Sequence, residues 1–503
     1  MKRLAILVAL FLGASYGCSE AEDAAEGDDE ASGGGDPYAP GATSGGTGTG
    51  GGGDTDPPAR ATDGSLAGRG PEAGRDLVCN DLQGTSTYWM SADDSNSMAS
   101  PARARELIHL ALTPPPGEVR AHEFLNYYDV DYTRPDSGLA VTVEMAAGPG
   151  HLLTMLVGVQ AAAAVPRTRS LTFVVDDSGS MRGSSLERAR AAMTAVAGQL
   201  SAGDQVSLVT WDAGAPRLEG HLVDGPDDAA LLEAIGALDG SGGSDLVGGL
   251  ALGYQLAAAN RLDGAVNRLV LISDGGANPA EIDTDLIAGF AAEGDDAGIY
   301  LVGVGTGPAD GYDDALMDLV TEAGRGAYVY LDSTEEAGHV FGARFAEVMD
   351  VAARDVRVQL HLPEYLRISE TTAEEWGSNP DEIEPQHLAP GDSMSFFEVL
   401  SSACGGELPP EAGVDAKVTW IDPDTGAEQT ATFSASLADL AAGPSLAKAT
   451  AVSAWARALS TADAVRLVAA RDAAQTALAK LPADADLVEI IALAEQHPAW
   501  PAD

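Results

Sequence analysis

The middle of the chain, between about residues 170 and 351, alternates short apolar runs with stretches of helical periodicity. The runs read as strands at 170–175, 205–211, 268–273, 299–304 and 327–331. The stretches between and after them read as helices at 184–200, 228–238, 246–259, 286–292, 313–322 and 334–351. Near-continuous apolar strands separated by helices are typical of a mostly parallel sheet with helices on both faces. We therefore predict a doubly wound α/β fold for this region.

Oxygen-bearing side chains follow two of these strands and precede one of the helices. Asp176, Ser178 and Ser180 come directly after the first strand, and Asp274 follows the third. Ser244 lies in a Gly-rich segment just before a predicted helix. Because the carboxyl ends of parallel strands meet at one edge of a sheet, we expect these side chains to lie close together. Hydroxyl and carboxylate oxygens are ligands that suit Mg²⁺ or Mn²⁺.

A simpler structural interpretation exists for the first of these segments. Ser184 and Glu187 have the spacing of a capping box, and residues 176–180 alone would be read as a turn that caps the helix 184–200. Three oxygen-bearing segments at one edge of the sheet make a shared ligand site a better interpretation than a single capping turn.

This arrangement resembles the von Willebrand factor type A domain and its metal-ion-dependent adhesion site. The family pattern is Asp-x-Ser-x-Ser after the first strand, a Thr after a Gly pair, and an Asp after the fourth strand. Residues 176–180 match the first element and Asp274 matches the last. Ser244 stands where Thr is usual, and Asp245 is the alternative if the loop is shifted by one residue.

The resemblance implies a role for each ligand. Ser178, Ser180 and Ser244 would bind the metal directly, and Asp176 and Asp274 would bind it mainly through water. Neutral direct ligands leave the cation under-neutralised, so an open position accepts a carboxylate from a protein partner. The resemblance thus implies a Mg²⁺ (or Mn²⁺/Ca²⁺) cofactor, a partner that offers a carboxylate, and no catalytic residues.

Residues that flank the α/β region resemble a bacterial exported subfamily, the YfbK-like proteins. The likeness covers about residues 86–363, with the A domain at 169–350. Its N-terminal signature is a Pro-rich stretch followed by charged and aromatic residues: Pro114–Pro116, Val119, Arg120, Glu123, Asn126, Tyr127 and Tyr128.

The remaining segments predict further domains. Residues 77–168 form an N-terminal helix and strand segment, 351–440 a β-rich domain, and 441–503 C-terminal helices. Strands within 138–162 would pair with those of 355–435 in a sandwich, and helices are predicted at 445–460, 462–481 and 487–495.

The acidic residues at the turn 422–426 allow a second metal interpretation. Asp422, Asp424 and Glu428 suggest Ca²⁺, but the full EF-hand spacing is absent. We therefore predict a plain hairpin turn.

The first eighteen residues have the order of a secretory signal: Lys2 and Arg3, an apolar run, then small residues before Cys18. The segment at 14–18 resembles a bacterial lipobox, which predicts that Cys18 is lipidated, with an ordinary cleaved signal as the alternative. Ser19 then favours sorting to the outer membrane, facing periplasm or surface. Residues 19–76 are acidic and Gly-rich and are predicted to be a disordered tether.

Two further cysteines lie on either side of the α/β region. Cys79 and Cys404 would form a disulfide in an oxidising compartment, or else be two unrelated buried thiols.

The charge balance limits the possible partners. The chain has 28 basic and 77 acidic residues, a formal net charge of −49, so nucleic acid is not expected as a partner. Membrane contact is expected only through a lipid anchor. Two other function classes stay open: an assembly scaffold with a silent metal site, and a metal-dependent hydrolase, although residues 176–177 lack the DxD spacing of a phosphatase.

Overall fold

The computed structural model describes residues 84–92, 97–147, 152–211, 214–276, 284–292, 298–403 and 408–501. The predicted signal, Cys18, the predicted tether and both Cys79 and Cys404 lie outside the described residues.

A six-stranded sheet lies at the centre of the α/β region, in the order β6-β5-β4-β7-β8-β9. Its strands are β4 (Arg169–Val175), β5 (Gln205–Thr210), β6 (Leu218–Leu222), β7 (Val266–Ser273), β8 (Tyr300–Gly305) and β9 (Tyr328–Tyr330). All neighbours are parallel except β6, which pairs antiparallel with β5. Every residue of β4 and β7 is buried, as the near-continuous apolar runs predicted. The predicted doubly wound fold is confirmed, and the polar edge strand β6 is an addition to it.

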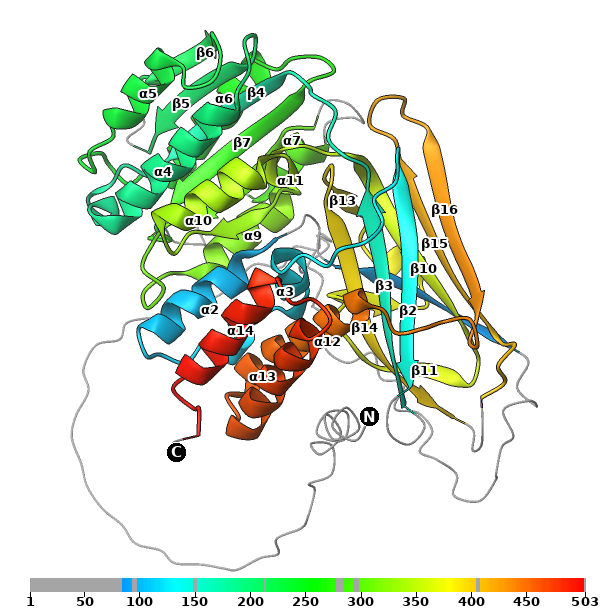
Figure 1. Cartoon of the computed structure of the whole chain (residues 1–503). Helices are drawn as coiled ribbons and strands as arrows, with labels where there is room; N and C mark the ends of the chain where they lie inside the picture. Colours follow the sequence, from blue (N-terminus) through cyan, green and yellow to red (C-terminus); the bar gives the residue numbers. More distant parts are fainter. Residues whose placement is uncertain are drawn as a thin grey trace, which may run out of the picture. The chain divides into compact units, whose positions relative to one another are not determined.

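Helices cover this sheet (Figure 1). They are α4 (Ser184–Gln199), α5 (Ala229–Gly236), α6 (Leu246–Ala259), α7 (Thr284–Ala292), α9 (Asp314–Gly324), α10 (Thr334–Gly338) and α11 (Phe345–Met349). Helix α6 packs on β4, β5 and β7, and α9 packs on β8. The single helix predicted at 334–351 is wrong in one respect, because a π-helical turn at His339–Ala343 separates α10 from α11.

The predicted capping box at the start of α4 is also wrong. Gly183 occupies the N-cap position with a φ of 91°, and no side chain caps the helix. Ser184 is already the first helical residue, so it cannot act as the residue before the helix.

A β-sandwich accompanies the α/β region and is built from both of its flanks. One sheet has the order β12-β1-β10-β15-β16, with β13 beside β10, and the other has the order β11-β14-β3-β2. The strands are β1 (Thr85–Ser91), β2 (Leu139–Ala147), β3 (Leu152–Ala161), β10 (Ala353–Pro363), β11 (Leu366–Thr371), β12 (Glu375–Gly377), β13 (Gln386–Leu388), β14 (Ser393–Ser402), β15 (Gly413–Ile421) and β16 (Glu428–Ser436). Apolar residues of both sheets form one core of their own.

Pairing between the two flanks follows the prediction. Strand β3 lies antiparallel to β14, with Leu156 opposite Phe397. The hairpin between β15 and β16 is the plain turn predicted at 422–426: the Asp422 carboxylate accepts hydrogen bonds from the backbone N–H of Asp424 at 3.0 Å and of Thr425 at 2.9 Å.

Helices from both ends of the chain pack together and against the rest. They are α2 (Ala99–His109), α3 (Ala121–Tyr127), α12 (Pro444–Thr461), α13 (Ala464–Leu478) and α14 (Ala485–Gln496). Helix α12 contacts α3 and β14, and α14 contacts α2 (Figure 1). Among the described residues, none of the helices combines the length and the apolar character that crossing a bilayer requires.

The charged residues of the N-terminal signature bind this segment to the α/β region. Arg120 Nη1 lies 2.6 Å from an Asp314 carboxylate oxygen on α9, and Arg120 Nε lies 2.6 Å from Glu123. Burial opposes ionisation of Asp314, but the guanidinium groups of Arg120 and Arg103 outweigh it and lower the pKa of Asp314. The signature is therefore structural: it holds α3 against α9.

Candidate metal-binding site

The candidate site lies where β4 and β7 end. These strands are parallel neighbours in register, with Val175 opposite Ile272, so the residues after each strand emerge at the same edge. The chain continues from β4 toward β5 on one side, while β7 and β8 lie on the other. This is the switch point of the sheet, where loops on open α/β sheets commonly form binding sites.

The first loop, after β4, brings a buried carboxylate and two hydroxyl groups together. Asp176 is 1% exposed, and its Oδ1 accepts a hydrogen bond from the Ser178 backbone N–H at 2.9 Å. The hydroxyl oxygens of Ser178 and Ser180 lie 2.9 Å apart, with Ser178 buried and Ser180 exposed. The loop therefore holds two hydroxyl oxygens close to a buried carboxylate, and none of its side chains caps α4.

The loop after β7 lies across from the first loop. Ser273 Oγ is 3.5 Å from Asp176 Oδ2, which links the two strand ends. Asp274 is largely buried, and its Oδ1 accepts from the Gly276 N–H at 3.0 Å. A Cβ added to Gly276 would lie 2.9 Å from Asp274 Oδ1 and 3.8 Å from Ser180 Oγ. Asp274 and Ser180 therefore face the same small space.

A third loop, residues 239–245, is held against the first by Asp177. Asp177 Oδ1 accepts hydrogen bonds from the N–H groups of Asp239 at 3.0 Å and Gly240 at 2.7 Å. Its backbone carbonyl accepts from the Gly242 N–H at 2.7 Å, and its Oδ2 pairs with Arg217 at 2.7 Å. These contacts fix the loop that carries Ser244 at this edge of the sheet.

Ser244 and Asp245 have different roles in the third loop. The Ser244 side chain is exposed, and Ser244 immediately precedes the N-cap of α6. Asp245 is that N-cap: its Oδ1 accepts from the Gly248 N–H at 2.9 Å, and its own N–H donates to the carbonyl of Trp211 at 2.9 Å. The structure therefore favours Ser244 over Asp245 as the residue available to a ligand.

Electrostatics at this edge favour a cation. Burial, together with the nearby Asp274 carboxylate, raises the pKa of Asp176 to about 6, against the hydrogen bonds from Ser178 and Ser273. Two carboxylates brought together in a buried position repel one another, and a divalent cation would relieve that repulsion.

The donor set fits the metal that the resemblance implies. Its chemistry is hydroxyl and carboxylate oxygen throughout, as Mg²⁺ and Mn²⁺ prefer, and the five predicted ligands all lie on three loops of one sheet edge. The ligand residues would be Asp176, Ser178, Ser180, Ser244 and Asp274.

Sequence reasoning missed the residues that support this set. Asp177 clamps two loops, Arg217 pairs with it, and Ser273 links the two strand ends. Asp177 was visible only as the neighbour of Asp176, and Arg217 lies 40 positions away in the chain. Nothing in the spacing of these residues indicates their contact.

A second acidic cluster elsewhere has a different explanation. Carboxylate oxygens of Asp129, Glu347 and Asp392 lie within 4.8 Å of one another. Arg344 lies among them, 2.9 Å from Asp129 and in contact with Glu347. Because a guanidinium already supplies the positive charge there, we assign no metal to this cluster.

Comparisons with known proteins agree with the fold. Residues 171–277 match the family model of the von Willebrand factor type A domain. The chain is 28% identical over 274 residues to YfbK of Escherichia coli (strain K12). This alignment covers 52% of this chain and 47% of YfbK. It is also 28% identical over 194 residues to sll0103 of Synechocystis sp., and this alignment covers 38% of this chain and 44% of that protein. The chain thus spans about half the length of the curated relatives it matches.

Among solved structures, a von Willebrand factor type A protein from Catenulispora acidiphila is similar with a TM-score of 0.45 and 16% identity. That match covers 74% of this chain and 99% of the other.

Proposed function

Because the chain contains a von Willebrand factor type A domain and is similar to YfbK, we propose that it binds a protein partner through a divalent metal. The domain itself indicates a protein-interaction or adhesion function. The observation that carries the finer proposal is the Ser178–Ser180 hydroxyl pair, 2.9 Å apart, beside the Asp176 and Asp274 carboxylates.

Each residue would contribute to binding in its own way. The hydroxyls of Ser178, Ser180 and Ser244 would hold the ion, and Asp176 and Asp274 would hold its water ligands. The bound metal supplies a positive charge that three neutral ligands do not cancel. A Glu or Asp carboxylate of the partner would complete the site, so recognition would depend on one acidic side chain.

The N-terminal sequence supports an anchored location in the cell envelope. We infer that residues 1–18 direct export, that Cys18 carries lipid, and that residues 19–76 hold the folded part away from the membrane. Ser19 supports the outer membrane as the destination. An oxidising compartment would also permit the disulfide between Cys79 and Cys404, which stays a prediction.

The partner proposal is tested with a defined acidic ligand. A fluorescent peptide with one central Glu, and the same peptide with Gln, are titrated with the protein in Mg²⁺ and in EDTA. We expect binding of the Glu peptide in Mg²⁺ alone, lost in S178A/S180A. The control S434A/S436A removes two serines of the same spacing from the outer strand β16 and should bind like the wild type.

The alternative classes predict other results. An assembly scaffold with a silent site would bind its partner equally well in EDTA. A metal-dependent hydrolase would turn over a substrate and lose that turnover in Asp176→Ala. Binding of both peptides with equal affinity in Mg²⁺ and in EDTA would contradict the proposed function.

A further inference from the structure

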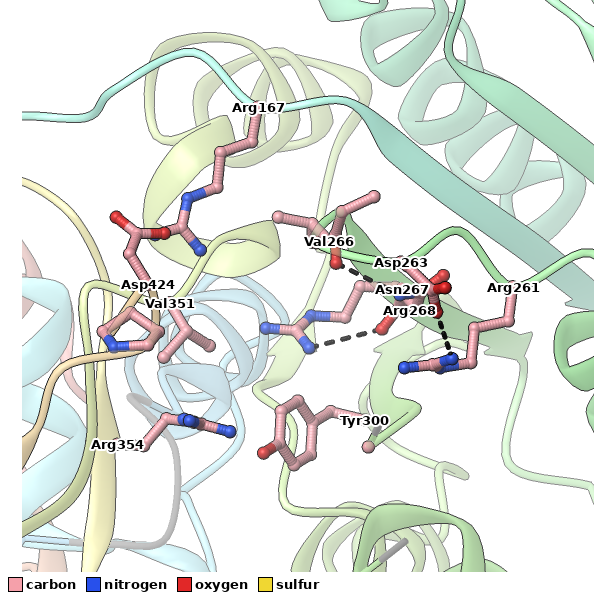
Figure 2. Close-up of a pocket in the computed structure, with 14 residues that line it drawn as sticks. Arg167, Arg261, Asp263, Val266, Asn267, Arg268, Tyr300, Val351, Arg354 and Asp424 are labelled. Carbon is pink, nitrogen blue, oxygen red and sulfur yellow. Dashed lines mark hydrogen bonds and ion pairs between the residues drawn. The ribbon is translucent and has the colours of Figure 1, made fainter. Parts of the chain in front are cut away.

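An arginine-lined cavity (Figure 2) opens at the amino end of β7, whereas the candidate metal site follows the carboxyl end of the same strand. Its volume is about 390 Å³, and it lies between the amino ends of β7 and β8 and residues of β10 and the β15–β16 turn. Strand β7 has eight residues, so at ~3.3 Å each its two ends lie roughly 25 Å apart. The cavity and the metal site are therefore separate places on the molecule.

Four of the chain's 28 basic residues line this one cavity: Arg167, Arg261, Arg268 and Arg354. In a chain of net charge −49, such a gathering of arginines needs a reason. The two aspartates that line the cavity do not explain the presence of all four arginines, because each already pairs with one of them. Asp424 pairs with Arg167, and the exposed Asp263 pairs with Arg261 at 2.7 Å.

Arg268 is the residue that lacks such a partner. Its side chain belongs to a residue only 6% exposed, and among the described residues no carboxylate lies within 4.0 Å of its guanidinium. Its contacts are a 3.5 Å hydrogen bond to the carbonyl of Asn267 and the face of the Tyr300 ring, 4.8 Å away. Its Nε is buried and has no hydrogen-bond partner in the part of the chain that the structure describes.

The carboxylate of Asp350, whose charge acts on Arg268, already pairs with another arginine. Asp350 accepts hydrogen bonds from Arg169 at 3.2 and 3.0 Å. Burial lowers the pKa of Arg268 to about 10, although Tyr300 and Asp350 act in the opposite direction. At neutral pH the guanidinium therefore remains charged, and a buried charge without a counter-charge is unfavourable.

The surroundings of Arg268 carry more positive charge. Arg354 of β10 lines the same cavity, and its guanidinium lies beside Tyr300 (Figure 2). His387 packs against Tyr300, with ring centroids 4.8 Å apart, and neither of its buried ring nitrogens has a hydrogen-bond partner among the described residues. Burial, with the charges of Arg325, Arg268 and Arg354, lowers the pKa of His387 to about 3. His387 is therefore neutral at pH 7, and it neither offsets nor adds to the positive charge of the arginines.

We propose that this cavity binds an oxyanion, a phosphate- or carboxylate-bearing small ligand, through Arg268 and Arg354. A planar guanidinium donates paired N–H groups to two oxygens of such an anion, and the volume suits a group of that size. The anion would supply the counter-charge that Arg268 lacks and would join β7 of the parallel sheet to β10 of the sandwich. This proposal is independent of the metal site.

The test is isothermal titration calorimetry of the full chain with inorganic phosphate and with citrate, at constant ionic strength set by chloride. We expect saturable binding in the wild type, weakened at least about tenfold in Arg268→Met. The matched control Arg367→Met, an exposed arginine on β11, and the metal-site variant S178A/S180A should bind like the wild type.

The arms of the experiment also distinguish the ligand source. Tighter binding of phosphate assigns the site to phosphate-bearing ligands, and tighter binding of citrate assigns it to polycarboxylates. Absence of binding of both anions to the wild type would overturn the proposal whether or not Arg268→Met folds. Equal binding by Arg268→Met and the wild type would overturn it too.

Discussion

At the scale of a single residue, Asp177 holds two loops of the candidate site in position. It is 1% exposed, and its two carboxylate oxygens hold the backbone of Asp239 and Gly240 and the side chain of Arg217. Loss of one partner from a buried charge-assisted network leaves the other groups without a counterpart. The neighbour of the predicted ligand Asp176 is thus a support residue and not a ligand.

The variant Asp177→Ala should lower the free energy of unfolding by roughly 2–4 kcal/mol. It should also weaken Mg²⁺ binding, because the loop that carries Ser244 loses its anchor. Urea unfolding and a metal titration measure the two effects. The control Asp472→Ala removes a half-exposed aspartate paired with its neighbour Arg471 and should change stability little. A stability of Asp177→Ala equal to that of the control would contradict this role.

Glu398, inside the sandwich, makes stability depend on pH. It is fully buried, its Oε1 accepts from Thr371 Oγ1 at 2.8 Å, and among the described residues its Oε2 has no hydrogen-bond partner. Burial raises the pKa of Glu398 from 4.5 to about 8, against the Thr371 hydrogen bond. The folded protein therefore binds more protons than the unfolded chain between these values. This contribution to stability is complete below the unfolded pKa and is lost as the pH rises through the folded pKa.

The variant Glu398→Gln should remove this dependence. The unfolding free energy of the variant minus that of the wild type should increase from pH 5 to pH 8, by at most roughly 1.4 kcal/mol per pH unit. Urea unfolding at the two pH values measures it, with the exposed Glu428→Gln as control. A difference between Glu398→Gln and the wild type that does not change with pH would show that Glu398 ionises freely in the folded protein.

At the scale of elements, two adjacent residues at the start of α6 have different roles. Asp245 caps the helix through the Gly248 N–H, whereas Ser244 offers an exposed hydroxyl. Asp245→Ala should lower the free energy of unfolding by about 1 kcal/mol and keep the Mg²⁺ response. Ser244→Ala should keep stability and lose metal affinity. The reverse pattern in paired melting and metal titrations would assign the ligand to Asp245.

The elements also show what sequence alone can predict. Continuous apolar strands such as 268–273 need burial on both faces, so their place in a parallel sheet was predictable. The edge strand β6, with residues Leu218–Leu222, is polar and half-exposed, and no apolar pattern marks it. The N-cap of α4 depends on a glycine at φ 91°, a conformation that the Ser184–Glu187 spacing does not reveal.

At the scale of the whole molecule, long-range contacts lie beyond sequence patterns. A metal site at one edge of the sheet could be predicted from the sequence, because the carboxyl ends of parallel strands lie at the same edge. Its predicted ligands there are Asp176, Ser178, Ser180 and Asp274. The Asp177–Arg217 pair and the arginine cavity depend on loop and sheet packing between distant segments. No spacing rule anticipates such contacts.

The predicted anchor gives a whole-molecule prediction. Cys18→Ser should shift the protein from the membrane fraction to the soluble fraction after cell lysis, because the lipid attachment site is lost. Fractionation and immunoblotting of the wild type and the variant measure this. An unchanged membrane fraction in Cys18→Ser would contradict lipid anchoring at this residue.

The central claim is that the domain holds a divalent metal through the hydroxyls of Ser178 and Ser180. Thermal melting of the wild type, S178A/S180A and the control S434A/S436A in Mg²⁺, Mn²⁺ and EDTA tests it most directly. A ligand that binds only the native state stabilises it by about 2.7 kcal/mol at a hundred times Kd. We predict that either metal raises the Tm of the wild type and of the control, and does not change that of S178A/S180A. The same metal response in S178A/S180A, or none in the wild type at millimolar metal, would contradict the account.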